Sequence, residues 1–174
     1  MRKIILSLVM AFMASSAFAE DAESLMNQYK SMKGANYGDI TDSMKVQAER
    51  VKDKLPQNYD LAKRIKKIHF VIVELNADDM IALTNRIEKI DNYKCIYQIK
   101  ENVVNAENET STDYPNRQYY GIEDKGVIKE AIARVDFRVS NRTFTSILHV
   151  VGDLKIDDVL NMMGFEEINK LQNL

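Results

Sequence analysis

Apolar residues recur at steps of three and four in four stretches of the chain, which is the spacing that buries one face of a helix. The four stretches are residues 25–32, 44–55, 80–90 and 156–163. Gly34, Pro56 and Gly164 follow three of them as stop signals, because glycine and proline readily end helices. The pattern predicts four amphipathic helices, with a shorter helix at residues 165–171.

Other stretches have the composition or the alternation of β-strands. Residues 68–75, IHFVIVEL, are apolar at nearly every position, which predicts a central strand covered on both faces. Alternation in residues 93–100 predicts a strand with one buried face. Three further strand-like stretches follow one another through short turns and predict an antiparallel meander. They are residues 117–123, 127–137 and 144–151.

The remaining segments complete the predicted architecture. Residues 35–40 contain Asn36 and Gly38 and predict at most a short edge strand, whereas the polar residues 102–116 predict a long exposed loop. Neither an internal repeat nor a linker interrupts residues 20–174. The simplest assembly is one α+β domain, in which helices pack on one face of a largely antiparallel sheet.

The first 19 residues have the layout of a secretory signal peptide. Arg2 and Lys3 precede the apolar residues 4–14, and small residues then lead to a predicted cleavage between Ala19 and Glu20. The apolar run is too short to span a bilayer, which takes about 20 residues in a helix. We therefore expect a periplasmic or secreted protein without a permanent membrane anchor.

Removal of this segment changes the charge balance. The whole chain has 174 residues, 24 Lys or Arg and 26 Asp or Glu, whereas residues 20–174 keep 22 basic and 26 acidic residues. A mildly acidic chain gives no electrostatic reason to expect nucleic acid or anionic lipid as a partner. The one dense basic run is predicted to be a solvated approach to the next strand. It consists of Lys63, Arg64, Lys66 and Lys67.

Cysteine and histidine are scarce. The single Cys95 lies on the apolar side of its predicted strand, which predicts a buried, unreactive thiol. His69 and His149 both fall within predicted strands, and two separated imidazoles do not make a zinc site unless carboxylates join them. The sequence thus predicts packed histidines, no metal and no cofactor.

Paired carboxylates are the remaining candidates for chemistry. The pairs are Asp78 with Asp79, Asp157 with Asp158, and Glu166 with Glu167. Each pair begins a predicted helix, where negative charge is favourable, so capping is the simpler interpretation. The acidic loop residues Glu107, Glu109 and Asp113 lack the spacing and the glycine of a calcium loop. Motifs for phosphate cradles, dinucleotides, serine nucleophiles and paired-histidine helices are absent from the sequence.

Four segments together resemble a bacterial family of secreted domains. They are residues 25–44, 92–101, 123–126 and 150–159, and with the signal peptide and the order of elements they are similar to domain of unknown function 4252. The resemblance covers most of residues 20–174, implies a component of the cell envelope, and carries over no catalytic residues. The chain departs from the family in lacking a lipidation cysteine and in its longer polar loop before Arg117.

The combined observations favour an exported, non-catalytic module that binds a protein or another envelope component. The predicted partner surface is Tyr114, Arg117, Tyr119 and Tyr120, because tyrosine joins a large apolar ring to a polar tip and is enriched at interfaces. Packing of these tyrosines within the sheet is the alternative. Two other functions stay open, a small envelope hydrolase that uses acidic residues and a carrier of an apolar ligand between helices and sheet.

Overall fold

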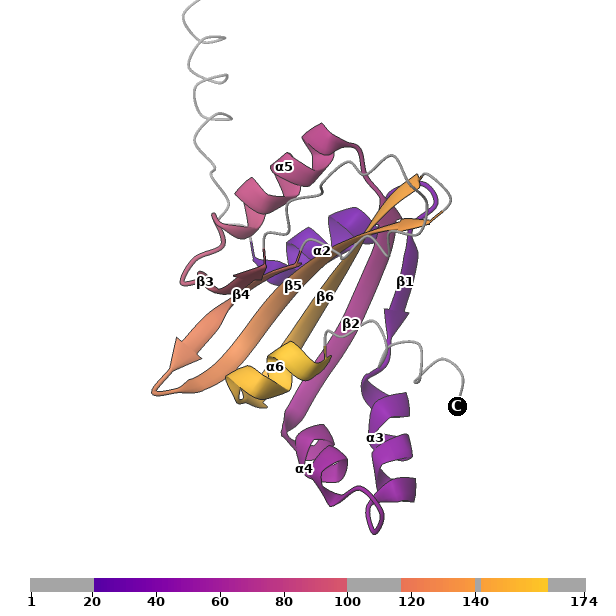
Figure 1. Ribbon diagram of the computed structural model, residues 1–174, viewed down its shortest axis with the longest axis vertical. Coiled ribbons are helices and arrows are strands. Elements are labelled where there is room, and N and C mark those ends of the chain that lie inside the picture. Colours follow the sequence, from indigo (N-terminus) through magenta and orange to yellow (C-terminus); the bar gives the residue numbers. More distant parts are fainter. Residues whose placement is uncertain (1–20, 100–116, 140–141, 163–174) are drawn as a thin grey trace, which may run out of the picture.

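The computed structural model describes residues 21–99, 117–139 and 142–162 (Figure 1). The helices in these residues are α2 (Ala22–Lys30), α3 (Thr41–Val51), α4 (Pro56–Arg64), α5 (Ala77–Ile87) and α6 (Ile156–Met162). The strands are β1 (Asn36–Asp39), β2 (Ile65–Glu74), β3 (Lys94–Ile99), β4 (Arg117–Asp124), β5 (Val127–Val139) and β6 (Arg142–Leu154).

The strands form one six-stranded antiparallel sheet in the order β1-β2-β6-β5-β4-β3. The predicted α+β class and the meander of β4, β5 and β6 are confirmed. The turn between β4 and β5 contains Lys125 and Gly126 with φ of 52° and 81°. Positive φ at both central residues is what a tight two-residue hairpin requires, and glycine adopts it without strain.

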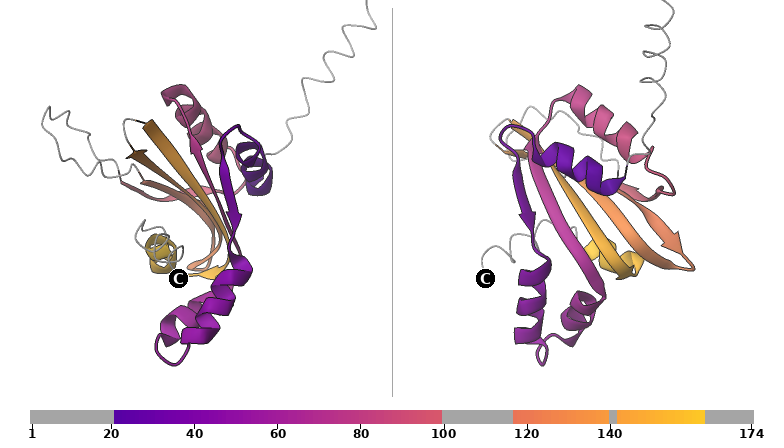
Figure 2. Two further views of the ribbon diagram at one scale, coloured as in Figure 1. Left: turned by 90° about the vertical axis from the view of Figure 1, so that its right-hand side faces the viewer. Right: turned by 180° about the vertical axis from the view of Figure 1, so that it is seen from behind.

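Helices pack on both faces of this sheet, so the prediction of helices on one face is not confirmed. α2 and α5 contribute Leu25, Met26, Leu83 and Ile87 to one buried apolar cluster, which we call the α2–α5 face. Val159 of α6 belongs to a second buried cluster, the α6 face. Figure 2 shows α2 and α6 on opposite sides of the strands. The sequence marks each helix as amphipathic, but amphipathicity does not say which face of a sheet the helix covers.

The segment around Pro56 differs from its prediction. Pro56 ends no long helix but begins α4, where it occupies the first turn, and a proline there sacrifices no helical hydrogen bond. Lys63 and Arg64 are therefore in the last turn of a helix, and β2 begins directly afterwards at Ile65. Lys63 and Lys66 are exposed, as predicted, whereas Arg64 and Lys67 are half-buried.

Gly152 does not end the last strand as predicted, because β6 continues to Leu154. A Cβ atom at Gly152 would lie 2.4 Å from the backbone oxygen of Arg64. Glycine within a strand often marks such a close approach of another backbone. The residue thus lets the end of α4 pass tightly over β6.

Cys95 is exposed, and the prediction of a buried thiol is wrong. β3 is an edge strand, and its register with β4 shifts between Cys95 and Tyr97. Such a bulge breaks the simple alternation of side chains on which the prediction rested. Ile96, between them, packs instead against the cluster of the α6 face.

A buried ion pair holds α5 on the sheet. The Arg134 guanidinium donates to both carboxylate oxygens of Asp136, at 3.0 and 2.5 Å, and Thr145 donates to the same carboxylate at 2.7 Å. Arg134 also donates to the hydroxyl of Thr84 and to the backbone oxygen of Met80, both in α5. Every charged group in this network has a partner, which is the condition under which a buried ion pair is tolerated.

We expect Arg134→Met to lower the free energy of unfolding by about 3–5 kcal/mol, because it leaves the Asp136 carboxylate buried without its counter-ion. Urea denaturation followed by circular dichroism measures the loss. The double variant Arg134→Met/Asp136→Leu should recover most of it, since both charges are then removed. Equal losses in the single and double variants would contradict this account.

Cys95 should react with a maleimide in the folded protein at a rate close to that in denaturant, because its side chain is exposed on an edge strand. Mass spectrometry of the native and the urea-unfolded protein provides the comparison. A thiol that reacts only after unfolding would contradict the position of β3.

Candidate functional site

The only two histidines of the chain lie side by side at the centre of the sheet. His69 of β2 and His149 of β6 are direct partners in the antiparallel register. His69 Nε2 lies 2.6 Å from His149 Nδ1, and the ring centroids are 4.8 Å apart. Both side chains are almost fully buried, with 1% and 2% of their surface exposed. Two strands that are adjacent in Figure 1 thus join residues 80 positions apart in the sequence.

A carboxylate from α2 approaches the same point. Asp21 caps this helix by accepting from the Ser24 N–H at 2.6 Å, which fixes the first turn that contains Glu23. Glu23 Oε2 lies 3.9 Å from His69 Nε2. One ligand atom each from Glu23, His69 and His149 lies within 4.8 Å of the others. Glu23 is exposed, so the cluster meets solvent on the α2 side.

Each imidazole uses its other nitrogen for a further contact. Tyr37 Oη in β1 lies 3.3 Å from His69 Nδ1, and Glu130 Oε1 in β5 lies 2.7 Å from His149 Nε2. The hydrogen bond from His149 holds the pKa of the Glu130 carboxyl below its usual value. Glu130 therefore acts as an acceptor that orients the His149 ring.

One assignment of protons satisfies all three contacts. Tyr37 donates to His69 Nδ1, His69 Nε2–H donates to His149 Nδ1, and His149 Nε2–H donates to Glu130. Both imidazoles are neutral in this arrangement. Burial is the main cause that lowers the pKa of His69 to about 4, and the repulsion that would arise if both rings were charged adds to it.

Two more side chains lie beside the carboxylates of this cluster, Lys67 next to Glu23 and Tyr93 next to Glu130. Lys67 Nζ lies 2.7 Å from Glu23 Oε2, and this hydrogen bond lowers the pKa of the Glu23 carboxyl. On the other side, the buried hydroxyl of Tyr93 has no hydrogen-bond partner among the described residues. Burial, together with the nearby negative charge of Glu130, raises the pKa of Tyr93 well above its ordinary value.

The donor set fits a divalent transition metal. Zinc binds neutral imidazole nitrogens and carboxylate oxygens, and its histidine ligands usually donate their second nitrogen to a carboxylate or another acceptor. His149 already has that outer partner in Glu130, and the Tyr37 oxygen can accept from His69 Nδ1. Two nitrogens on one tetrahedral zinc lie about 3.4 Å apart. His69 Nε2 and His149 Nδ1, now 2.6 Å apart, would therefore have to separate by about 0.8 Å.

The described residues of the predicted partner surface do not form an exposed patch. Tyr119 and Tyr120 are both buried, one in the cluster of the α6 face and the other on the α2–α5 face, so the prediction that they form a surface is wrong. Adjacent residues of a strand point to opposite faces, and both faces here are covered. Arg117 is half-buried in β4, and Tyr114, like Ala19 and Glu20, lies outside the described residues.

The acidic pairs occupy helix starts. Asp78 and Asp79 lie in the first turn of α5, and Asp157 and Asp158 in the first turn of α6. Asp158 also pairs with Arg64 at 2.6 Å. The two helices contribute to different faces of the sheet, so these pairs do not converge on one site. Glu166, Glu167 and the acidic residues of the loop before Arg117 lie outside the described residues.

The metal-free protein should lose stability as the pH falls from about 6.5 to about 4. In this window the unfolded chain binds a proton at His69 that the folded chain excludes, so the stabilisation is complete above pH 6.5 and is lost toward pH 4. The shift corresponds to about 3 kcal/mol. Urea denaturation across this pH range, with a chelator present, measures the loss.

The control for this measurement is His69→Gln, which should flatten the profile in the same window. An unchanged slope in this variant would assign the acid sensitivity to the neighbouring carboxylates Glu23, Asp39 and Glu130, whose pKa values are lowered in the folded chain.

None of the helices in the described residues is long and apolar enough to cross a membrane. Comparisons with protein-family models, curated proteins and solved structures find no significant match. The resemblance to domain of unknown function 4252 stays a prediction, and conclusions about function depend on the geometry of the chain itself.

Proposed function

We propose that this chain is an exported protein of the bacterial envelope that binds a divalent transition metal, with zinc as the best fit, through Glu23, His69 and His149. The observation that supports the proposal is the convergence of two imidazole nitrogens and one carboxylate oxygen within 4.8 Å, drawn from α2, β2 and β6. This convergence supplies the carboxylate that the two separated histidines lack in the sequence pattern.

Nitrogen ligands distinguish the candidate metals. Calcium and magnesium prefer all-oxygen sites, whereas imidazole suits zinc, copper, nickel and iron. Three protein ligands leave at least one coordination position for water or for a ligand of the metal, in contrast to closed structural sites with four protein ligands. A neutral His69 favours binding, because metal ligands must be deprotonated.

Lys67 competes with the metal for Glu23. Its ammonium group occupies the same carboxylate oxygen that faces His69, at 2.7 Å. The hydrogen bond to Glu23 is the main cause that raises the pKa of Lys67. The negative charge of Asp39, a second anion near Lys67, raises it further. Metal binding would therefore release Lys67 from Glu23 toward solvent or Asp39, and this exchange lowers the net affinity of the site.

The other two functions have less support. A hydrolase based on acidic residues alone needs two carboxylates in one cleft, and the pairs at the starts of α5 and α6 lie on different faces. A carrier of an apolar ligand needs a space between helices and sheet, where α2 and α5 instead pack against buried apolar side chains.

The test is titration of residues 20–174 with Zn²⁺ and Co²⁺, followed by calorimetry and by the visible absorption of bound cobalt. We expect one ion per chain. His149→Gln and Glu23→Gln should each weaken binding by about 100-fold or more, and Glu130→Gln by about 10–100-fold, because it only orients His149. Lys67→Met should strengthen binding by freeing Glu23.

Glu123→Gln is the matched control, because it neutralises an exposed carboxylate of β4 that is distant in the sheet from β2. Circular dichroism verifies that each variant folds. Binding that is unchanged by Glu23→Gln and His149→Gln, or that weakens equally in Glu123→Gln, would overturn the proposed site.

A further inference from the structure

Positive charge is concentrated in one part of the chain, residues 41–67, which we call the basic hairpin. It comprises α3, α4 and the start of β2, and it contains eight Lys or Arg against four Asp or Glu. The remainder of residues 20–174 holds 14 basic and 22 acidic residues. The mild average charge of the chain thus conceals two regions of opposite sign.

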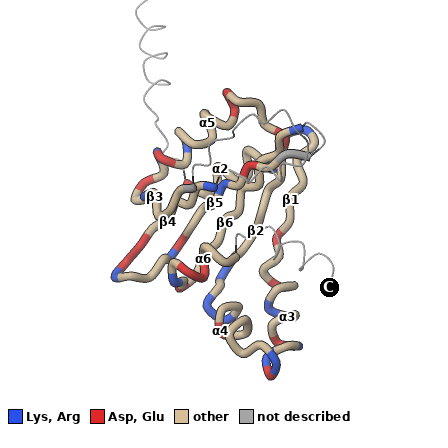
Figure 3. The backbone as a smooth tube through the Cα atoms, in the orientation of Figure 1, with Lys and Arg blue, Asp and Glu red and all other residues tan. Residues whose placement is uncertain are grey.

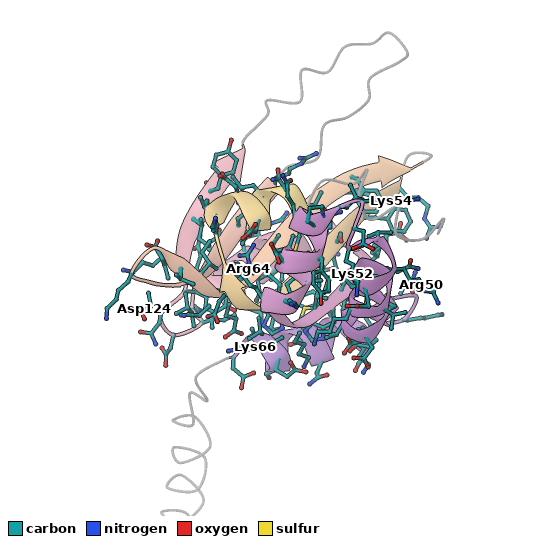
Figure 4. The ribbon with its side chains drawn as sticks, turned by 90° about the horizontal axis from the view of Figure 1, so that it is seen from below. Arg50, Lys52, Lys54, Arg64, Lys66 and Asp124 are labelled. Carbon is teal, nitrogen blue, oxygen red and sulfur yellow. The ribbon has the colours of Figure 1, made fainter. Side chains whose placement is uncertain are left out.

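The basic hairpin extends from one end of the sheet (Figures 1 and 3). α3 and α4 pack against each other and against β2, yet each has only one buried residue, Ala48 and Ala62 respectively. Helices that bury so little of their own surface leave most of their side chains in solvent. Figure 4 views this end and shows Arg50, Lys52 and Lys54 on it, with Asp124 well to one side.

Several of these cations have no ion-pair partner within the described part of the chain. They are Lys45, Arg50, Lys54 and Lys66, and all four are exposed. Lys52 and Arg64, by contrast, pair with Glu49 and Asp158. The unpaired cations produce a positive field that internal contacts do not neutralise.

Exposed aliphatic side chains accompany these cations. Val46 is 52% exposed and Leu55 is 49% exposed, and both belong to the basic hairpin. Val46 and Arg50 are four residues apart in α3 and so share one side of the helix, while Leu55 follows Lys54 in the connection between the helices. Cations interspersed with exposed apolar side chains are typical of segments that lie on anionic membranes.

We propose that the basic hairpin docks reversibly on the surface of an anionic lipid bilayer. Charge complementarity supports this partner: the hairpin is attracted to the lipid headgroups, and the net negative remainder of the chain is repelled, so the molecule has one preferred orientation. Val46 and Leu55 can enter the interface between headgroups and acyl chains. An acidic protein segment would use the cations but would not need two separate exposed aliphatic side chains.

The experiment is co-sedimentation of residues 20–174 with vesicles of phosphatidylcholine, with or without phosphatidylglycerol. This form of the chain contains every residue of both buried clusters. We expect binding only to the anionic vesicles and loss of binding at high salt. Arg50→Glu/Lys54→Glu should weaken partitioning by about 25-fold or more, since each basic residue near an anionic surface contributes about fivefold. Leu55→Ser should weaken it further.

The matched control is Lys33→Glu/Lys89→Glu, which changes the net charge equally at exposed positions outside the basic hairpin. Equal losses in the two double variants, equal binding to neutral vesicles, or no binding to anionic vesicles would overturn the proposal. Capture of an acidic peptide without vesicle binding would assign the hairpin to a protein partner instead. Circular dichroism controls for folding, and a chelator in all samples separates the result from metal binding.

Discussion

The pairing of β2 with β6 is the constraint on which the rest of the structure depends. These strands share an antiparallel register from Ile65 to Glu74, and they bring the middle of the chain beside its last strand. A shift of one residue would turn His69 and His149 toward opposite faces of the sheet. The same register places Val71 opposite Ile147, inside the apolar cluster beneath α2 and α5. The core and the candidate site are therefore fixed by one set of backbone hydrogen bonds.

The two faces of the sheet have different chemistry. The α6 face is filled largely by aliphatic side chains and small residues such as Ala131 and Ala133. The α2–α5 face carries, beside its apolar cluster, two separate buried polar groups: the histidine pair and the network of Arg134 and Asp136. In the Arg134 network the guanidinium donates to acceptors on both β5 and α5, and these hydrogen bonds hold α5 against the sheet. The histidine cluster instead contains an exposed carboxylate and a competing lysine, which makes it the more adaptable of the two.

Much of the fold could be predicted from local patterns. The apolar run of β2 and the short turn that joins β4 to β5 each depend on neighbouring residues only, and the structure has both. The failures depend on longer-range contacts. Cys95 became exposed because a bulge changes the alternation at an edge strand, and Tyr119 became buried because a second layer of helices covers its face. The sequence placed both histidines in strands, but alternation does not reveal which strands are neighbours.

The candidate site spans nearly the whole length of the folded chain. Glu23 lies in α2 and His149 in β6, the first helix and the last strand of the described residues, so the three ligand atoms meet only when α2, β2 and β6 are all in place. Loop closure over such a distance carries an entropic cost, and a bound ion would offset part of it by stabilising only the complete fold. A chain truncated before β6 would lack His149 as well as the strand that pairs with β2, so it could not hold the ion in this way. Metal occupancy would thus distinguish fully folded chains from chains in which β6 has not yet paired with β2.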